Sequence, residues 1–88
     1  MIRNKRTLYK MYRDAKKEHP HKIVLIGNQN WYESFGVDAL DLHKYLGLVI
    51  TWRKDGENEM PMAGFPKEKA VENLQILIKE CNQKVVIL

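Results

Sequence analysis

The sequence predicts an α/β (α+β) fold in which a mixed β-sheet is flanked by about three helices. Three segments carry apolar residues at helical spacing, and short apolar runs of strand length lie between them. The elements follow in the order α-β-β-α-β-(β)-α-β, which favours helices packed on a mixed sheet. A chain of 88 residues buries enough surface for one small core. We therefore expect a single domain over residues 1–88.

The first predicted elements are a helix and a β-hairpin. Apolar residues at helical spacing predict an amphipathic helix over residues 4–18, which Pro20 ends. Residues 22–26 contain a continuous apolar run short enough for a buried strand, and the turn formers of residues 27–30 follow it. Residues 31–35 also have strand length, so the two runs predict a hairpin.

The middle of the chain is predicted to form a second helix and a third strand. Residues 38–46 carry one apolar stripe, and Gly47 is placed to cap the end of this helix. Residues 48–52 are rich in β-forming side chains. A polar turn around Asp55-Gly56 is expected to follow, over residues 54–58.

The last third is predicted to contain a connector, a helix and a strand. Residues 61–66 have small and apolar side chains between two prolines, which favours a buried connector with Met62 and Phe65 largely buried. Residues 67–81 carry a wide apolar stripe and predict a third helix. That stripe consists of Ala70, Val71, Leu74, Leu77, Ile78 and Cys81. Residues 85–88 predict a strand that is central or covered, because a bare apolar edge invites aggregation.

The net charge of +4 is unevenly distributed. Residues 1–22 hold eight Lys and Arg residues against Asp14 and Glu18, and the rest of the chain carries a charge of −2. A basic end on a nearly neutral body suits a polyanionic partner such as nucleic acid. A solvated helix face rich in lysine would give the same pattern, so charge alone leaves both interpretations open.

The sequence lacks the usual marks of an enzyme, a metalloprotein or a membrane protein. Neither a G-x-x-x-x-G-K-[ST] loop nor a G-x-G-x-x-G motif occurs. The single cysteine, Cys81, allows no internal disulfide and is expected to be a small buried hydrophobe. The three histidines, His19, His21 and His43, have no carboxylates placed to complete a metal site. No apolar run follows the N-terminus. We therefore expect a non-catalytic cytoplasmic protein without cofactor, metal or membrane partner.

The run Trp31-Tyr32-Glu33 is a candidate contact site. Residues i and i+2 of a strand point to the same face, so Trp31 and Glu33 project together and Tyr32 points the other way. If Tyr32 faces the core, Trp31 and Glu33 face solvent side by side. In the alternative, Trp31 packs under a loop or helix and Glu33 is merely solvated.

Four short motifs occur in order along the chain. They are Glu18-His19-Pro20, Gln29-Asn30-Trp31-Tyr32-Glu33-Ser34-Phe35, Pro61-Met62-Ala63-Gly64-Phe65-Pro66 and Ala70-Val71-Glu72-Asn73. Their order and spacing resemble those of the N-terminal mismatch-recognition domain of the MutS DNA mismatch-repair proteins, which carries G-D-F-Y-E-L-F, P-M-A-G-I-P and A-V-E-N. The resemblance covers about residues 8–88, with three residues between Pro66 and Ala70 where the family has two. It implies the fold of MutS domain I.

The resemblance also implies a function in DNA binding. In the family, the aromatic residue of F-x-E wedges beside a mispaired base from the minor groove, and the glutamate hydrogen-bonds that base. These roles fall on Trp31 and Glu33 here. Arg53 and Lys54 lie where the family also has basic residues, so they become candidate phosphate contacts. The implied partner is mismatched or distorted double-stranded DNA.

Departures from the family pattern leave a second interpretation open. Trp31 replaces the smaller phenylalanine, and Gln29-Asn30 replaces Gly-Asp, so the wedge and the turn differ. The connector, lever, clamp and ATPase domains of the family have no counterpart in these residues. The alternative is a protein-interaction module that keeps the fold while the Trp31 surface docks another protein, one that supplies the missing domains. The sequence is also compatible with a piece of a longer chain.

Overall fold

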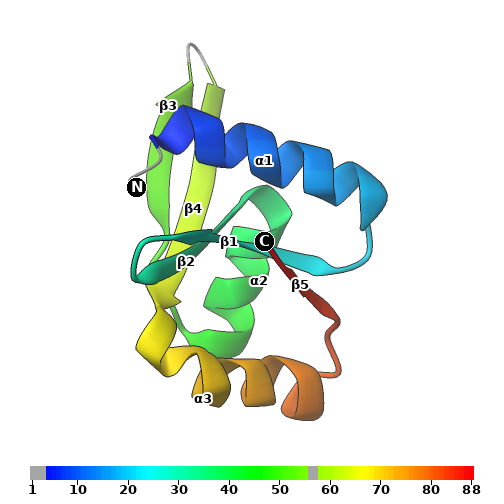
Figure 1. The fold of residues 1–88 in the computed structure, drawn as a ribbon. Coiled ribbons are helices and arrows are strands. Elements are labelled where there is room, and N and C mark those ends of the chain that lie inside the picture. Colours follow the sequence, from blue (N-terminus) through cyan, green and yellow to red (C-terminus); the bar gives the residue numbers. More distant parts are fainter. Residues whose placement is uncertain (1–3, 56–57) are drawn as a thin grey trace.

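The computed structural model describes residues 4–55 and 58–88. Within these residues, five strands form one sheet in the order β3-β4-β2-β1-β5, and three helical segments pack on it (Figure 1). The elements are α1 (Lys5–Glu18), β1 (Ile23–Asn28), β2 (Trp31–Phe35), α2 (Gly36–Leu46), β3 (Thr51–Asp55), β4 (Asn58–Pro66), η1 (Lys67–Lys69), α3 (Ala70–Gln75), η2 (Ile76–Glu80) and β5 (Val85–Ile87). Because β5 runs parallel to β1 and the other pairs are antiparallel, the sheet is mixed, and the predicted fold class is confirmed.

Helix α1 and the hairpin after it form much as predicted. The Asn4 side chain accepts a hydrogen bond from the Thr7 backbone N–H at 2.8 Å, which fixes the start of α1. Strand β1 extends to Asn28, so the turn narrows to Gln29 and Asn30 between the paired residues Asn28 and Trp31. Gln29 has φ 54°, a left-handed backbone that favours glycine. The turn thus has a glycine-like backbone although its first residue is glutamine.

The segment around the two prolines is strand β4, so the expectation of a connector was wrong. A proline removes a backbone donor and is usually kept out of central strands. Here β3 pairs with residues 58–62 of β4 and β2 pairs with residues 62–66, so only Met62 has strand neighbours on both sides. Each proline lies where one side of β4 has no paired strand, which accommodates the missing N–H. The predicted burial is confirmed, since Phe65 is 1% exposed and Met62 9%.

The third strand begins later than predicted. Residues 48–50 precede it, and β3 runs from Thr51 to Asp55, antiparallel to β4. The predicted polar turn narrows accordingly, because Asp55 already pairs with Asn58. The Gly56 of that turn lies outside the described residues.

The second helix begins earlier than predicted, and the third helix buries fewer of its apolar side chains than predicted. Helix α2 starts at Gly36 and ends before Gly47, whose φ of 71° makes it the predicted left-handed cap. The third helix is continuous through η1, α3 and η2, but its buried side is narrower than the predicted stripe. Val71 is 74% exposed and Ile78 48%, and Cys81 is half-buried rather than buried.

Strand β5 lies at an edge of the sheet, so the first of the two expected placements, a central strand, is wrong. Among the described residues it pairs with β1 alone, and Ile87 is 43% exposed. The strand is three residues long. A very short edge strand offers few unpaired backbone groups to a neighbouring chain, which limits aggregation without a cover.

Two hydrophobic cores lie on opposite faces of the sheet. Helix α1 covers one face, and α2 and α3 cover the other; Figure 1 shows α1 above β1 and β2 and α3 below them. The α1 core consists of Leu8, Tyr12, Ala15, Val24, Ile26, Phe35 and Met62. The opposite core consists of Ile23, Leu25, Ala39, Leu42, Ala63, Phe65 and Leu77. Strand β2 therefore alternates between the two cores, and this alternation positions the candidate site.

Candidate functional site

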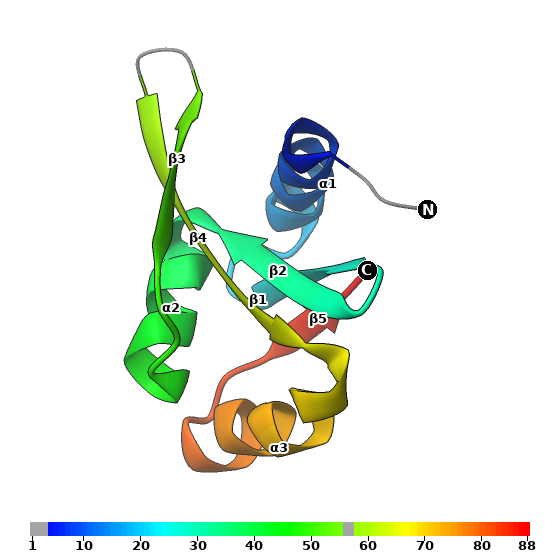
Figure 2. The ribbon, with the colours of Figure 1, turned by 90° about the vertical axis from the view of Figure 1, so that its left-hand side faces the viewer.

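Trp31 and Glu33 lie on the face of β2 that α1 partly covers. Phe35, two residues further along, is fully buried under α1, whereas Trp31 at the other end of β2 is 48% exposed. Tyr32 points to the opposite core, where its ring meets that of Phe65 with centroids 5.9 Å apart. The prediction that Trp31 is accessible and shares a face with Glu33 is confirmed. Figure 2 looks along α1 and shows the start of this helix with β2 below it and the β3–β4 hairpin beside it.

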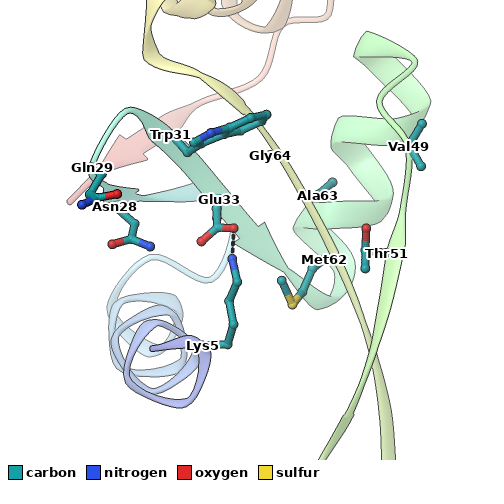
Figure 3. Close-up of a pocket in the computed structure, with 10 residues that line it drawn as sticks. All are labelled: Lys5, Asn28, Gln29, Trp31, Glu33, Val49, Thr51, Met62, Ala63 and Gly64. Carbon is teal, nitrogen blue, oxygen red and sulfur yellow. Dashed lines mark hydrogen bonds and ion pairs between the residues drawn. The ribbon is translucent and has the colours of Figure 1, made fainter. Parts of the chain in front are cut away.

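A groove of about 440 Å³ runs beside these two side chains (Figure 3). Trp31 lies at one end, and Val49 and Thr51 lie across from it. The lining residues are Lys5, Asn28, Gln29, Trp31, Glu33, Val49, Thr51, Met62, Ala63 and Gly64. The groove is therefore built from four parts of the chain: the start of α1, the β1–β2 hairpin, β4 and the segment leading into β3.

Trp31 also borders a second hollow of about 540 Å³. Asn30, Pro66, Lys67 and Glu68 line it with Trp31. Trp31 therefore lines both open volumes.

Glu33 does not face solvent, contrary to the simple prediction. Its side chain is 14% exposed, and its Oε1 forms an ion pair with Lys5 Nζ from the start of α1. The other oxygen, Oε2, is buried and has no hydrogen-bond partner among the described residues. Figure 3 shows the Lys5 side chain reaching up to the carboxylate. Lys5 belongs to the basic end noted in the sequence, but no sequence pattern assigned it to this site.

The backbone of Gly64 packs closely against Glu33. The two residues are paired across β4 and β2, and a Cβ added to Gly64 would lie 2.5 Å from the Tyr32 carbonyl oxygen and 3.2 Å from Glu33 Cγ. A backbone atom at 2.5 Å cannot be displaced cheaply. The glycine of the Pro61-to-Pro66 motif therefore lets β2 approach closely and leaves room for the Glu33 side chain.

Arg53 and Lys54 do not join Trp31 and Glu33 in one pocket. Arg53 pairs with Met60, six residues along β4 from the partner of Trp31, which corresponds to about 20 Å at a rise of about 3.3 Å per residue. Arg53 shares the groove face, because Thr51 lines the groove and residues two apart point the same way, whereas Lys54 points to the other face. Lys54 is exposed.

The Arg53 guanidinium lies in a small recess between α1 and the β3–β4 hairpin. Arg6, Tyr9, Phe35 and Met60 line this recess with it. Arg53 Nη1 is buried and has no hydrogen-bond partner among the described residues. Two cationic side chains therefore converge on this recess.

A buried polar network that sequence reasoning missed holds the site's framework together. Asp38, 1% exposed in the first turn of α2, accepts hydrogen bonds from Tyr12 Oη at 3.0 Å, Lys16 Nζ at 2.9 Å and the Val24 N–H at 3.1 Å. Burial, and after it the charge of Asp38, raise the pKa of the Tyr12 hydroxyl above its ordinary range. The network fixes α1 to β1 and α2. An aspartate in a first helical turn is a common capping residue, so the sequence carried no specific signal for this role.

The parts of the chain that the structure describes contain no cluster of three or more His, Cys, Asp or Glu side chains able to hold a metal ion. None of their helices is both long and apolar enough to cross a membrane. The candidate site consists of Trp31, the Lys5–Glu33 pair and the two hollows that Trp31 lines.

The site and the fold define a small α/β domain with an exposed aromatic residue and a carboxylate on one sheet face. The family model described as MutS domain I matches residues 6–88. This chain therefore belongs to the MutS family, as a MutS domain I.

Individual relatives agree with this assignment. The chain is 36% identical over 78 residues to "DNA mismatch repair protein MutS" of Salinibacter ruber. The aligned segment covers 88% of this chain and 9% of that protein. It is 42% identical over 73 residues to the protein of the same name from Methanococcoides burtonii, covering 81% of this chain and 8% of the relative. It is 38% identical over 81 residues to the protein of the same name from Rickettsia canadensis, covering 91% of this chain and 9% of the relative. The chain thus spans less than a tenth of the length of these relatives.

Proposed function

We propose that this chain is a non-catalytic module that binds mismatched or distorted double-stranded DNA. Trp31 acts as a wedge, the Glu33 carboxylate accepts a hydrogen bond from a base, and Arg53 and Lys54 contact phosphates. The similarity to proteins named for DNA mismatch repair supports the nature of the partner. A module held by one wedge and a few phosphate contacts should bind weakly, with a Kd of about 10⁻⁴–10⁻⁶ M.

The observation that carries the proposal is that the half-exposed Trp31 lines both hollows. An inserted side chain must unstack a base step, which costs a few kcal/mol in a regular duplex. A mispaired step is more deformable, so the cost falls there and selectivity follows. The indole is 48% exposed and lines both hollows, so a base could stack on its exposed surface.

The charges around Trp31 suit discrimination more than affinity. Lys5 and Lys67 border the two hollows, but Glu33 and Glu68 lie among the same residues and offset them. A carboxylate near phosphates is repelled unless a base offers it a donor. The net attraction must therefore come from cations further away, such as Arg53 and Lys54 about 20 Å along the sheet.

The test is a titration of a regular duplex and the same duplex with one G·T pair, at about 50 mM salt where phosphate contacts are strong. We expect the wild-type protein to prefer the G·T duplex. Trp31→Ala should leave binding to the regular duplex nearly unchanged and abolish the preference. Trp52→Ala is the matched control, because Trp52 is also exposed but is the neighbour of Arg53 on β3 and lines neither hollow.

A protein-interaction module is the second candidate, and one observation favours it. Val49 is 82% exposed and Trp52 59%, so apolar side chains lie open at and beside the edge strand β3. Apolar surface of this kind suits a protein partner better than a phosphate backbone. If the wild-type protein binds neither duplex, even at about millimolar DNA, where non-specific binders are normally occupied, the DNA proposal fails and this candidate replaces it.

A further inference from the structure

We infer that Lys5 covers the Glu33 carboxylate in the free protein and competes with the base for it, so that Lys5 sets the degree of mismatch discrimination. The inference rests on the proposed function, since it concerns how Glu33 becomes available to a base. The ligand that opens the pair is a base with an unpaired N–H donor, which binds Glu33. A neighbouring phosphate of the same duplex binds the ammonium group of Lys5.

The geometry leaves a base donor no free oxygen on Glu33. Oε1 is occupied by Lys5 Nζ, and Oε2 is buried without a partner among the described residues. The β4 backbone lies close on the side of Gly64. The ammonium group of Lys5 is itself an N–H donor, so it stands where a base donor would have to come.

Lys5 can leave this position at low cost, whereas Glu33 is held. The Lys5 side chain is 41% exposed and the Glu33 side chain 14%. Lys5 is the first residue of α1, directly after the N-cap residue Asn4, so its long side chain can swing without disturbing the helix. With its lysine end exposed, this ion pair is weaker than a fully buried one, and a nearby phosphate offers the ammonium group an equivalent partner.

Two exchanges then occur on a mismatched duplex. Lys5 moves from the carboxylate to a phosphate, and Glu33 exchanges the ammonium donor for the base N–H. On a regular duplex the base donors are already paired, so the Lys5–Glu33 pair stays closed and shields the phosphates from the carboxylate. Discrimination in the wild-type protein is therefore reduced in two ways: by the part of the free energy of opening the pair that the new phosphate contact does not offset, and by the shielding of Glu33 on the regular duplex.

The experiment compares Lys5→Met and Lys5→Gln with Lys10→Met. Lys10 is exposed on the same helix and forms no ion pair among the described residues. The substitution Lys10→Met therefore removes one positive charge without affecting Glu33. The ratio of G·T to regular-duplex affinity should rise in both Lys5 variants by up to about fivefold. This factor corresponds to about 1 kcal/mol, the upper end of the interaction free energies of ion pairs near a surface. Lys10→Met should leave the ratio unchanged. In a Glu33→Gln background, Lys5→Met should no longer alter it.

A salt titration supplies a readout that a purely structural role would not change. Since Lys5 gains a phosphate only on the mismatched duplex, the wild-type slope of log affinity against log salt should be steeper there by about 0.9, and Lys5→Met should remove that difference. Melting curves of each variant verify folding. A ratio that falls or stays constant in the Lys5 variants, while the wild type prefers G·T, overturns this inference alone. A wild type without any preference overturns the proposed function and this inference with it.

Discussion

At the scale of single residues, the site depends on what surrounds two side chains rather than on those side chains alone. Trp31 matters because it is half exposed and lines both hollows, and Glu33 because Lys5 and Gly64 pack against it. The alternation of strand residues predicted that Trp31 and Glu33 share a face. It could not predict the enclosure of Glu33, because Lys5 is 28 residues away in sequence.

Gly64 allows a direct test of this close packing. Gly64→Ala should lower the free energy of unfolding by about 1–3 kcal/mol, since the new Cβ would lie 2.5 Å from the Tyr32 carbonyl oxygen and force the strands apart. Urea denaturation measures the effect. Gly27→Ala is the matched control, because its Cβ would meet the flexible end of Lys67 at 3.2 Å and the Leu88 carbonyl oxygen at 3.3 Å, contacts that a small shift relieves. An equal cost for both substitutions would show that the β2–β4 approach is not the constraint.

At the scale of elements, the sequence predicted the helices and the hairpin better than it predicted β3 and β4. Periodicity locates elements that bury one face, as α1 and the hairpin do. It failed for β4 because the prolines suggested a break, whereas the structure places each proline where the strand has one free side. It also overestimated the buried face of the third helix, since an apolar side chain such as Val71 can stay exposed.

Phe65 tests the assignment of β4 as a core strand. Phe65→Ala should destabilise the domain by about 3–5 kcal/mol, because this fully buried ring packs against Tyr32 and the helices on that face. In a domain this small, such a loss can unfold the protein. Thermal melting provides the measurement, and Val71→Ala at a 74% exposed position should leave the midpoint unchanged. An unaltered midpoint for Phe65→Ala would disprove its role in the core.

Asp38 tests how the elements are joined. Asp38→Ala should cost about 3–5 kcal/mol, because Lys16 and the buried Val24 N–H would both lose their acceptor. Asp41→Asn is the control on the same helix. Burial, and after it the charge of Asp38, raise the pKa of Asp41, so its ionised form opposes folding above its ordinary pKa of 3.8. Near neutral pH, Asp41→Asn should therefore leave the free energy of unfolding, measured by urea denaturation, unchanged or slightly increased. A loss as large as that of Asp38→Ala would contradict this role of Asp38.

At the scale of the whole molecule, the proposed wedge residue Trp31 and the candidate phosphate contacts lie at opposite ends of β4. Trp31 is opposite Pro66, and Arg53 is opposite Met60, about 20 Å away along the strand. A separation of this size spans several base pairs of duplex. Affinity and discrimination should therefore be separable by mutation, because they belong to different ends of the sheet.

Arg53 and Lys54 test that separation. Each of Arg53→Ala and Lys54→Ala should weaken binding to regular and G·T duplexes alike and flatten the slope of log affinity against log salt by about 0.9. Affinities measured at several salt concentrations give the slope. A variant that lost the mismatch preference but kept the slope would place that residue at the recognition end instead.

Fluorescence of Trp31 shows whether its indole inserts beside a mispaired base. Trp52→Phe leaves Trp31 as the single tryptophan of the chain, so its emission reports on this side chain alone. If Trp31 inserts beside a mispaired base, the G·T duplex should quench and shift its emission strongly, while the regular duplex at equal occupancy should change it little, because unstacking is costly there. Identical spectra on the two duplexes, with both bound, would contradict the wedge and leave only non-specific attraction to the phosphate backbone.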